Sequence, residues 1–153
     1  MPFRLRSEAH GFFKHIRSSF AMDFDMYYLC LMAGLAAARK EDVPTSQASE
    51  LVDHFPGEYR AKGRVIVALF LSRELTELGI ARSNRGVLHT AIAQLVDPLS
   101  PSHLSDDGMK ELNKYSYGGY SVLSEWFDDP PRVFEAFLPL YKQKLDSIII
   151  RPR

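Results

Sequence analysis

The feature that most constrains this chain is a run of fifteen residues, 24–38, in which every residue except Asp25 and Gly34 is apolar. If the run is a helix, no face of it is polar, so neighbouring elements must cover it on nearly every side. A bilayer span needs about 18 such residues, and the four residues that follow, 39–42, are all charged. The run therefore predicts the central helix of a folded core, or a helix buried at a subunit interface, rather than a membrane span.

Length and composition indicate one domain. The chain has 153 residues, 46% of them hydrophobic, which is enough to bury a core without disulfides or a structural metal. We therefore predict an all-α fold, a compact single-domain bundle of about six to eight helices around the apolar helix at about 24–38. Cys30 is the one cysteine, so no intrachain disulfide can form. Since no secretory signal or membrane-spanning segment is recognised, we expect a cytoplasmic protein with no membrane partner.

Capping residues and hydrophobic periodicity divide the rest of the chain. An extended lead at 3–6 precedes a helix that Ser7 caps and that runs to about Ser18. Residues 41–59 are the least regular part, in which we expect loops around one short amphipathic helix through Leu51 and Val52. A helix is expected at about 59–79, with Gly79 as a left-handed C-cap, and another at about 85–95, with Asn84 as N-cap. Three more helices are expected after it. One starts at Ser102 or Ser105 and continues through Leu112, one contains Tyr120–Phe127, and one runs from Asp129–Pro130 to about Ser147.

Two of these assignments leave alternatives. The apolar run 65–71 also suits a buried strand, but no second strand of comparable quality exists to pair with it, which favours a helix. Gly118 and Gly119 separate or bend the two helices on either side of them, or else allow close packing against another element.

No catalytic signature is present. The five histidines lack the spacing of a metal-protease pair, and a single cysteine excludes a zinc knuckle. The chain also lacks a nucleophile elbow, a phosphate-binding loop and a dinucleotide-binding fingerprint. The acidic pairs at 106–107 and 128–129 stand at predicted helix starts, where capping explains them better than metal catalysis. We therefore predict no catalytic residue, metal or cofactor, although a small enzyme stays open because catalytic residues need not be neighbours in sequence.

Two groups of basic residues are candidates for contact with a nucleic acid. Nineteen basic and nineteen acidic residues cancel, so any contact with DNA must be local. The first forty residues carry six Lys/Arg against three Asp/Glu, which gives the chain a basic head. The candidates are Arg4, Arg6, Lys14 and Arg17 in the head, and Arg60, Lys62 and Arg64 before the third long helix, with Arg82 and Arg85 as residues that extend either group.

Each candidate set has a plainer explanation. In a chain with 25% charged residues, both basic groups also suit an ordinary solvated face. An aromatic cluster could stack on bases, but its leucine and valine neighbours favour core packing. Its members are Tyr115, Tyr117, Tyr120, Trp126 and Phe127.

The opening of the chain combines a basic and apolar lead at 3–6, a Ser-Glu-Ala helix start at 7–9, and a second helix that contains Leu29 and Cys30. In these motifs the stretch Phe3 to Arg39 resembles the small DNA phosphorothioation protein E family. The resemblance implies an all-helical protein associated with bacterial DNA sulfur modification, which binds DNA, nicked DNA especially, as an oligomer through basic surface residues. On this resemblance the DNA-binding positions carried over are Arg4, Arg6, Lys14 and Arg17.

Two functional hypotheses follow. The first is a non-catalytic accessory subunit of a bacterial DNA-modification or phage-defence system, which binds duplex or nicked DNA through a local basic patch. The second is a protein-interaction subunit without nucleic-acid contact, either an adaptor for an ATPase or nuclease partner or a homo-oligomer. Convergence of the two basic groups on one surface favours the first hypothesis, and scattering favours the second.

Overall fold

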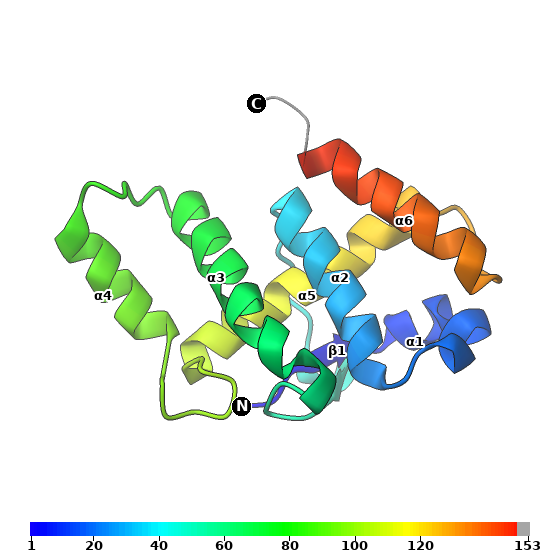
Figure 1. The fold of residues 1–153 in the computed structure, drawn as a ribbon, viewed down its shortest axis with the longest axis horizontal. Helices are drawn as coiled ribbons and strands as arrows, with labels where there is room; N and C mark the ends of the chain where they lie inside the picture. The colour runs from blue at the N-terminus through cyan, green and yellow to red at the C-terminus, as the bar shows by residue number, and fades with distance from the viewer. Residues whose placement is uncertain (150–153) are drawn as a thin grey trace.

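The computed structural model describes residues 1–149, and the fold is all-α, as predicted (Figure 1). A minor two-stranded sheet and three 3₁₀ helices, Lys14–Ser19, Thr45–Gln47 and Gly57–Tyr59, complete the described elements. The α-helices are α1 (Glu8–Phe12), α2 (Asp23–Ala37), α3 (Arg60–Glu77), α4 (Arg85–Leu95), α5 (Asp106–Trp126) and α6 (Phe134–Ile149).

The apolar run forms α2, which crosses the long helix α5 at the centre of the fold (Figure 1). The helices touch through glycines: a Cβ at Gly34 would overlap the backbone of Tyr115, and a Cβ at Gly119 would overlap the backbone of Cys30. The glycine pair therefore permits close packing and does not interrupt α5, which is continuous from Asp106 to Trp126. The expectation of a break between two shorter helices at Gly118–Gly119 is wrong.

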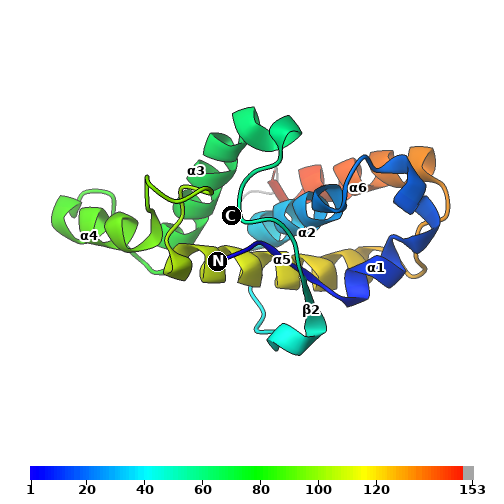
Figure 2. The ribbon, with the colours of Figure 1, turned by 90° about the horizontal axis from the view of Figure 1, so that it is seen from below.

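Other elements cover α2 on most sides, as its composition requires. Helices α3 and α6 flank it on one side of α5, whereas the small sheet lies on the other side of α5 (Figures 1 and 2). Most of α2 is buried. Tyr28, Met32 and Ala36 are only half-buried, and because they are four residues apart they form one stripe along the helix.

The two strands replace an expected helix. Strand β1 (Arg4–Arg6), at the position of the predicted extended lead, pairs antiparallel with β2 (Ala48–Glu50), and Leu5 stands opposite Ser49. Leu51 and Val52 follow β2 in an extended connection, so the short amphipathic helix predicted there is wrong. The backbone groups of Leu51 and Val52 form hydrogen bonds with Phe3. The Phe3 N–H donates to the Val52 carbonyl, and the Phe3 carbonyl accepts from the Leu51 N–H.

Two of the predicted helices have different bounds in the structure, for local reasons. The helix expected from Ser7 to Ser18 is divided into α1 and a 3₁₀ helix at Lys14–Ser19, and the adjacent Phe12 and Phe13 are both buried. Helix α6 begins at Phe134 rather than at Pro130. Pro131 follows Pro130 directly, and the residue before a proline is disfavoured in the helical conformation.

Helices α3 and α4 form a helical hairpin at one edge of the molecule (Figure 1). We refer to residues 60–96 as the α3–α4 arm. Gly79 adopts the predicted left-handed conformation after α3, with φ of 72°, and the side chain of Asn84 caps α4 by accepting from the Val87 N–H. The apolar run at 65–71 is helical, as predicted. Leu95 is the one residue of α4 that is fully buried, so most of α4 faces solvent.

Candidate nucleic-acid interface

Arg6 is engaged inside the fold. Its guanidinium forms ion pairs with Glu8 at 3.1 Å and Glu41 at 3.2 Å, and it also donates to the Ser121 hydroxyl and the Tyr117 carbonyl. The guanidinium carbon lies 5.0 Å from the centre of the Tyr120 ring. With this set of partners, Arg6 fastens β1 to α5 and has few donors left for a phosphate.

Two more of the head cations are paired. Arg4 forms an ion pair with Glu50 on the neighbouring strand at 3.2 Å. Arg17 pairs with Asp23 at 2.7 Å and donates to the Phe20 carbonyl, which ties the 3₁₀ helix to the start of α2. Lys14 is exposed and, within residues 1–149, has no carboxylate within ion-pair distance. The head therefore offers one unpaired cation out of the four predicted.

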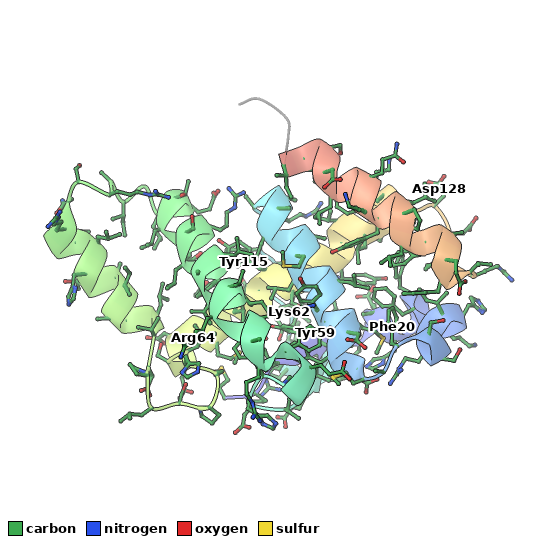
Figure 3. The ribbon with its side chains drawn as sticks, viewed as in Figure 1. Phe20, Tyr59, Lys62, Arg64, Tyr115 and Asp128 are labelled. Atoms are coloured by element: carbon green, nitrogen blue, oxygen red, sulfur yellow. The ribbon has the colours of Figure 1, made fainter. Side chains whose placement is uncertain are left out.

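The basic residues at the start of α3 differ from the head because they are unpaired within the described residues. Arg60, Lys62 and Arg64 are all exposed on the first turns of α3, and none has a carboxylate partner among the described residues. The Lys62 ammonium lies 5.7 Å from the ring centres of both Tyr28 and Tyr59. Figure 3 places Lys62 on the side of α3 that faces α2, and Arg64 on the side that faces α4. These three cations keep their donors free for a ligand.

The two groups do not form one surface. Strand β1, with Arg4 and Arg6, is held against α5 on the side opposite α3, as the position of the sheet in Figure 2 shows. Arg60, Lys62 and Arg64 belong to the α3–α4 arm instead. This scattering favours the protein-interaction hypothesis, so a DNA-binding surface would have to lie on one group by itself, and among the described residues the arm has the larger number of unpaired cations.

The arm is where the positive charge of the molecule gathers. Residues 60–96 contain six Lys/Arg and two Asp/Glu, a net charge of +4 in a chain whose total is zero. One of the two carboxylates, Glu74, is buried and pairs with Lys40. The other, Glu77, pairs with Arg73. A comparison of the two ends of the chain does not reveal this segregation, because the charge gathers in the middle of the sequence.

A buried ion pair holds the arm to the core. The Lys40 ammonium, just after α2, lies 3.0 Å from both carboxylate oxygens of Glu74, and the Tyr115 hydroxyl donates to the same carboxylate at 2.8 Å. Lys40 also pairs with Glu111 on α5. Burial, together with the hydrogen bond to Glu74, raises the pKa of Tyr115 above its ordinary range. The orientation of α3 is thus fixed by α2 and α5.

The predicted aromatic cluster belongs to the core. Tyr115 and Tyr117 are buried, and Trp126 packs edge-on against Tyr141, whose hydroxyl donates to the Leu29 carbonyl. Phe127 lies 5.2 Å from Phe137 between ring centres. Because these rings pack against other side chains of the core, little of their ring surface is accessible for stacking on a base.

Two fully buried groups of α2 have raised pKa values. Burial raises the pKa of the Cys30 thiol to about 12 and the pKa of Tyr27 well above its ordinary value. Within residues 1–149 no three His, Cys, Asp or Glu side chains gather closely enough to hold a metal ion. No helix of this part of the chain is both long and apolar enough to cross a membrane.

An apolar groove lies along the half-buried stripe of α2. It has a volume of about 400 Å³ and is walled by α3 and α6. Leu69 on the α3 wall and Ile149 on the α6 wall are 43% and 64% exposed. The apolar side chains of the groove are Met32, Leu35, Ala36, Leu69, Leu145 and Ile149.

Comparison of the chain with protein-family models, with curated proteins and with solved structures gives no match. The resemblance of the opening residues to the DNA phosphorothioation protein E family therefore stays a prediction.

Proposed function

We propose that this protein is a non-catalytic DNA-binding subunit whose phosphate contacts come from the α3–α4 arm. The observation that carries the proposal is the net charge of +4 on residues 60–96 of a neutral chain. Arg60, Lys62 and Arg64 supply three exposed cations without carboxylate partners within the described residues. A local positive surface of this kind attracts a polyanion even when the whole molecule has no net charge. Membership of a bacterial DNA-modification or phage-defence system follows only from the resemblance and belongs to the same proposal.

The proposal predicts a weak, salt-dependent affinity. Each phosphate contact contributes about 0.9 to the slope of log affinity against log salt concentration for duplex DNA. Three contacts from α3 therefore give a slope of about −2.7, and further cations of the arm make it steeper. Between about 50 and 200 mM salt, a slope of this size corresponds to a loss of affinity of about fortyfold.

The test is fluorescence anisotropy with a labelled duplex, intact and nicked, across that salt range. In the triple variant R60A/K62A/R64A we expect weaker binding to both duplexes and a slope smaller by up to about 2.7. The matched control is K110A/K142A/K144A, which removes the same charge from exposed lysines on α5 and α6. An equal effect of both variants would reduce the interaction to overall charge, and an unchanged slope in R60A/K62A/R64A would refute the proposed site.

A second candidate function is homo-oligomerisation through the groove between α3 and α6. A two-fold interface needs a protruding part and a receiving part on the same surface. Val65 and Leu69 on α3 are 58% and 43% exposed, and Leu69 lines the apolar groove. A second copy can therefore place its α3 side chains in the groove of the first, with no nucleic acid involved.

This candidate has its own test. If the groove joins two copies, the mass measured by light scattering should rise with protein concentration, and Leu69→Lys should return it to the monomer value. Leu99→Lys is the matched control, since Leu99 is 95% exposed and lies outside the groove. A monomer at about 100 μM would eliminate the oligomer, because a contact that weak gives less than about 6 kcal/mol of association free energy.

A further inference from the structure

Helix α4 presents a face to solvent that contains no acidic residue. Between Glu77 and Asp97 the chain has no Asp or Glu at all. The side of α4 that faces the protein carries Leu88, Ile92 and Leu95. The exposed side carries Gly86, His89, Thr90, Ala93 and Gln94, with Val87, 49% exposed, at its edge.

Cations stand at the N-terminal end of this face, and another lies on the neighbouring helix α3. Arg82 and Arg85 are exposed at the start of α4, and neither has a carboxylate partner within residues 1–149. Arg64 extends from α3 on the side that faces α4 (Figure 3). The exposed face of α4 is therefore an uncharged, hydrogen-bonding surface with positive charge beside it.

We propose that α4 enters the major groove of B-form duplex DNA while the neighbouring arginines contact phosphates. An eleven-residue helix is about 16 Å long and about 10–12 Å in diameter. The major groove is about 12 Å wide and admits a helix of this size. Arg85, in the first turn of α4, has the donors that pair with the edge of guanine. This inference rests on the proposed function, and it specifies the form of nucleic acid that the arm binds.

The composition of the arm favours a duplex over single strands. Proteins that hold single-stranded nucleic acid stack its bases on exposed aromatic side chains. The one Phe, Tyr or Trp between 60 and 96 is Phe70, which is fully buried. His89 is the one exposed ring of the arm, which is less than a row of stacked bases needs, and the other exposed groups suit phosphates and paired base edges.

The same face discriminates between DNA and RNA duplexes. The major groove of A-form RNA is deep and narrow, so a helix cannot reach the base edges there. On double-stranded RNA the arginines of the arm retain their phosphate contacts, while α4 loses its contacts with the base edges. A preference for B-form DNA over RNA of the same sequence is the signature of an inserted helix.

Acidic groups restrict the direction of approach. Asp97 follows the C-terminal end of α4, and Asp106 and Asp107 are exposed at the start of α5, which adjoins that end (Figure 1). Asp106 is partly neutralised by the Met1 ammonium at 3.3 Å. Repulsion between these carboxylates and phosphates directs the duplex toward the first two turns of α4 and the Arg82–Arg85 end.

The experiment compares the affinities of the full chain for a 20-base-pair DNA duplex, the RNA duplex of the same sequence and the single DNA strand at about 75 mM salt. We expect the DNA duplex to bind at least about tenfold more tightly than the other two. Equal affinity for the RNA duplex or the single strand would overturn the insertion of α4, while leaving a phosphate-binding arm intact. Absence of binding to any of the three would overturn both this inference and the proposed function.

One neutral substitution on α4 tests the face itself. Gly86→Leu adds bulk to the exposed side without a clash, because a Cβ at Gly86 meets no atom within 4 Å. It should lower affinity for the DNA duplex about fivefold or more and leave affinity for the RNA duplex unchanged. It removes no charge, so the salt slope should stay at the wild-type value, whereas R60A/K62A/R64A should lower it.

Protein stability serves as the control for folding. Gly86→Leu should leave the Tm unchanged or raise it, since leucine is a better helix former than glycine. A stable Gly86→Leu variant that keeps wild-type affinity for the DNA duplex would overturn the proposed insertion.

Discussion

The ion pair between Lys40 and Glu74 gives a sharp prediction about how the arm is held. Glu74 has a side chain that is 5% exposed, with Lys40 and Tyr115 as its hydrogen-bond partners. Lys40→Met keeps the length and packing of the side chain but leaves the buried carboxylate with the Tyr115 hydroxyl alone. Removing one partner of a buried ion pair lowers the free energy of unfolding by about 3–5 kcal/mol.

The structure places this variant at the low end of that range. Lys40 is 29% exposed, so water screens part of its interaction, and Tyr115 still donates to Glu74. We therefore expect Lys40→Met to lower the free energy of unfolding by about 3 kcal/mol. For a chain of 153 residues this corresponds to a fall in Tm of about 6–12 °C.

The double variant distinguishes the ion pair from simple packing. Lys40→Met/Glu74→Met removes both charges and replaces them with apolar side chains, and such replacements of buried pairs are often neutral. We expect it to be more stable than Lys40→Met by about 2 kcal/mol, measured by urea unfolding followed by circular dichroism at 222 nm. If Lys40→Met costs less than about 1 kcal/mol, or if the double variant is less stable than the single one, the buried pair does not anchor α3.

Three further predictions follow from side chains of the core and its edge. Arg6→Ala should destabilise the fold by about 2 kcal/mol in urea unfolding, because the side chain joins Glu8, Glu41 and Ser121, yet it should leave affinity for DNA unchanged; a loss of DNA affinity without a loss of stability would contradict this. Cys30, with its pKa raised to about 12 by burial, should not react with a thiol reagent at pH 8 until the protein is unfolded, and rapid labelling of the native state would show that α2 opens. Burial alone would raise the pKa of Glu111, but hydrogen bonds from Lys40 and Lys114 outweigh it and lower that pKa. The stability that Glu111 contributes is therefore present at neutral pH and lost as the pH falls below about 4.5, so Glu111→Gln should show a smaller fall in the urea midpoint between about pH 5 and 3.

Local features of the fold were predictable because local chemistry decides them. The apolar run at 24–38 gives α2, Asn84 caps α4, and Gly79 ends α3 in the left-handed conformation. In each case a few adjacent residues contain the cause. The start of α6 could also have been read locally, since Pro131 makes a helical Pro130 unfavourable.

Features that depend on distant partners were not predictable. The segment around Leu51 became the continuation of a strand because β1, more than forty residues earlier, offers it hydrogen-bonding groups. The pairing of the basic head was unpredictable for the same reason, since Arg6 meets Glu41 and Ser121 only in the folded chain. Charge counts along a sequence do not reveal which cations are neutralised in space. The basic arm, in contrast, is visible in the sequence as the acid-free stretch 78–96.

The hydrogen bonds of Asn113 have a consequence for the order in which the molecule can form. Its side-chain oxygen accepts from the Arg4 N–H and the Tyr27 hydroxyl, and its side-chain nitrogen donates to the Pro2 carbonyl. Phe3, beside these groups, is fully buried. During synthesis Phe3 can meet Phe24 and Tyr27 of α2 early, but the contacts of β1 with α5 form only after about residue 126 has emerged. This fold should therefore be completed only after α5 has been made, in a late step that closes β1 onto that helix.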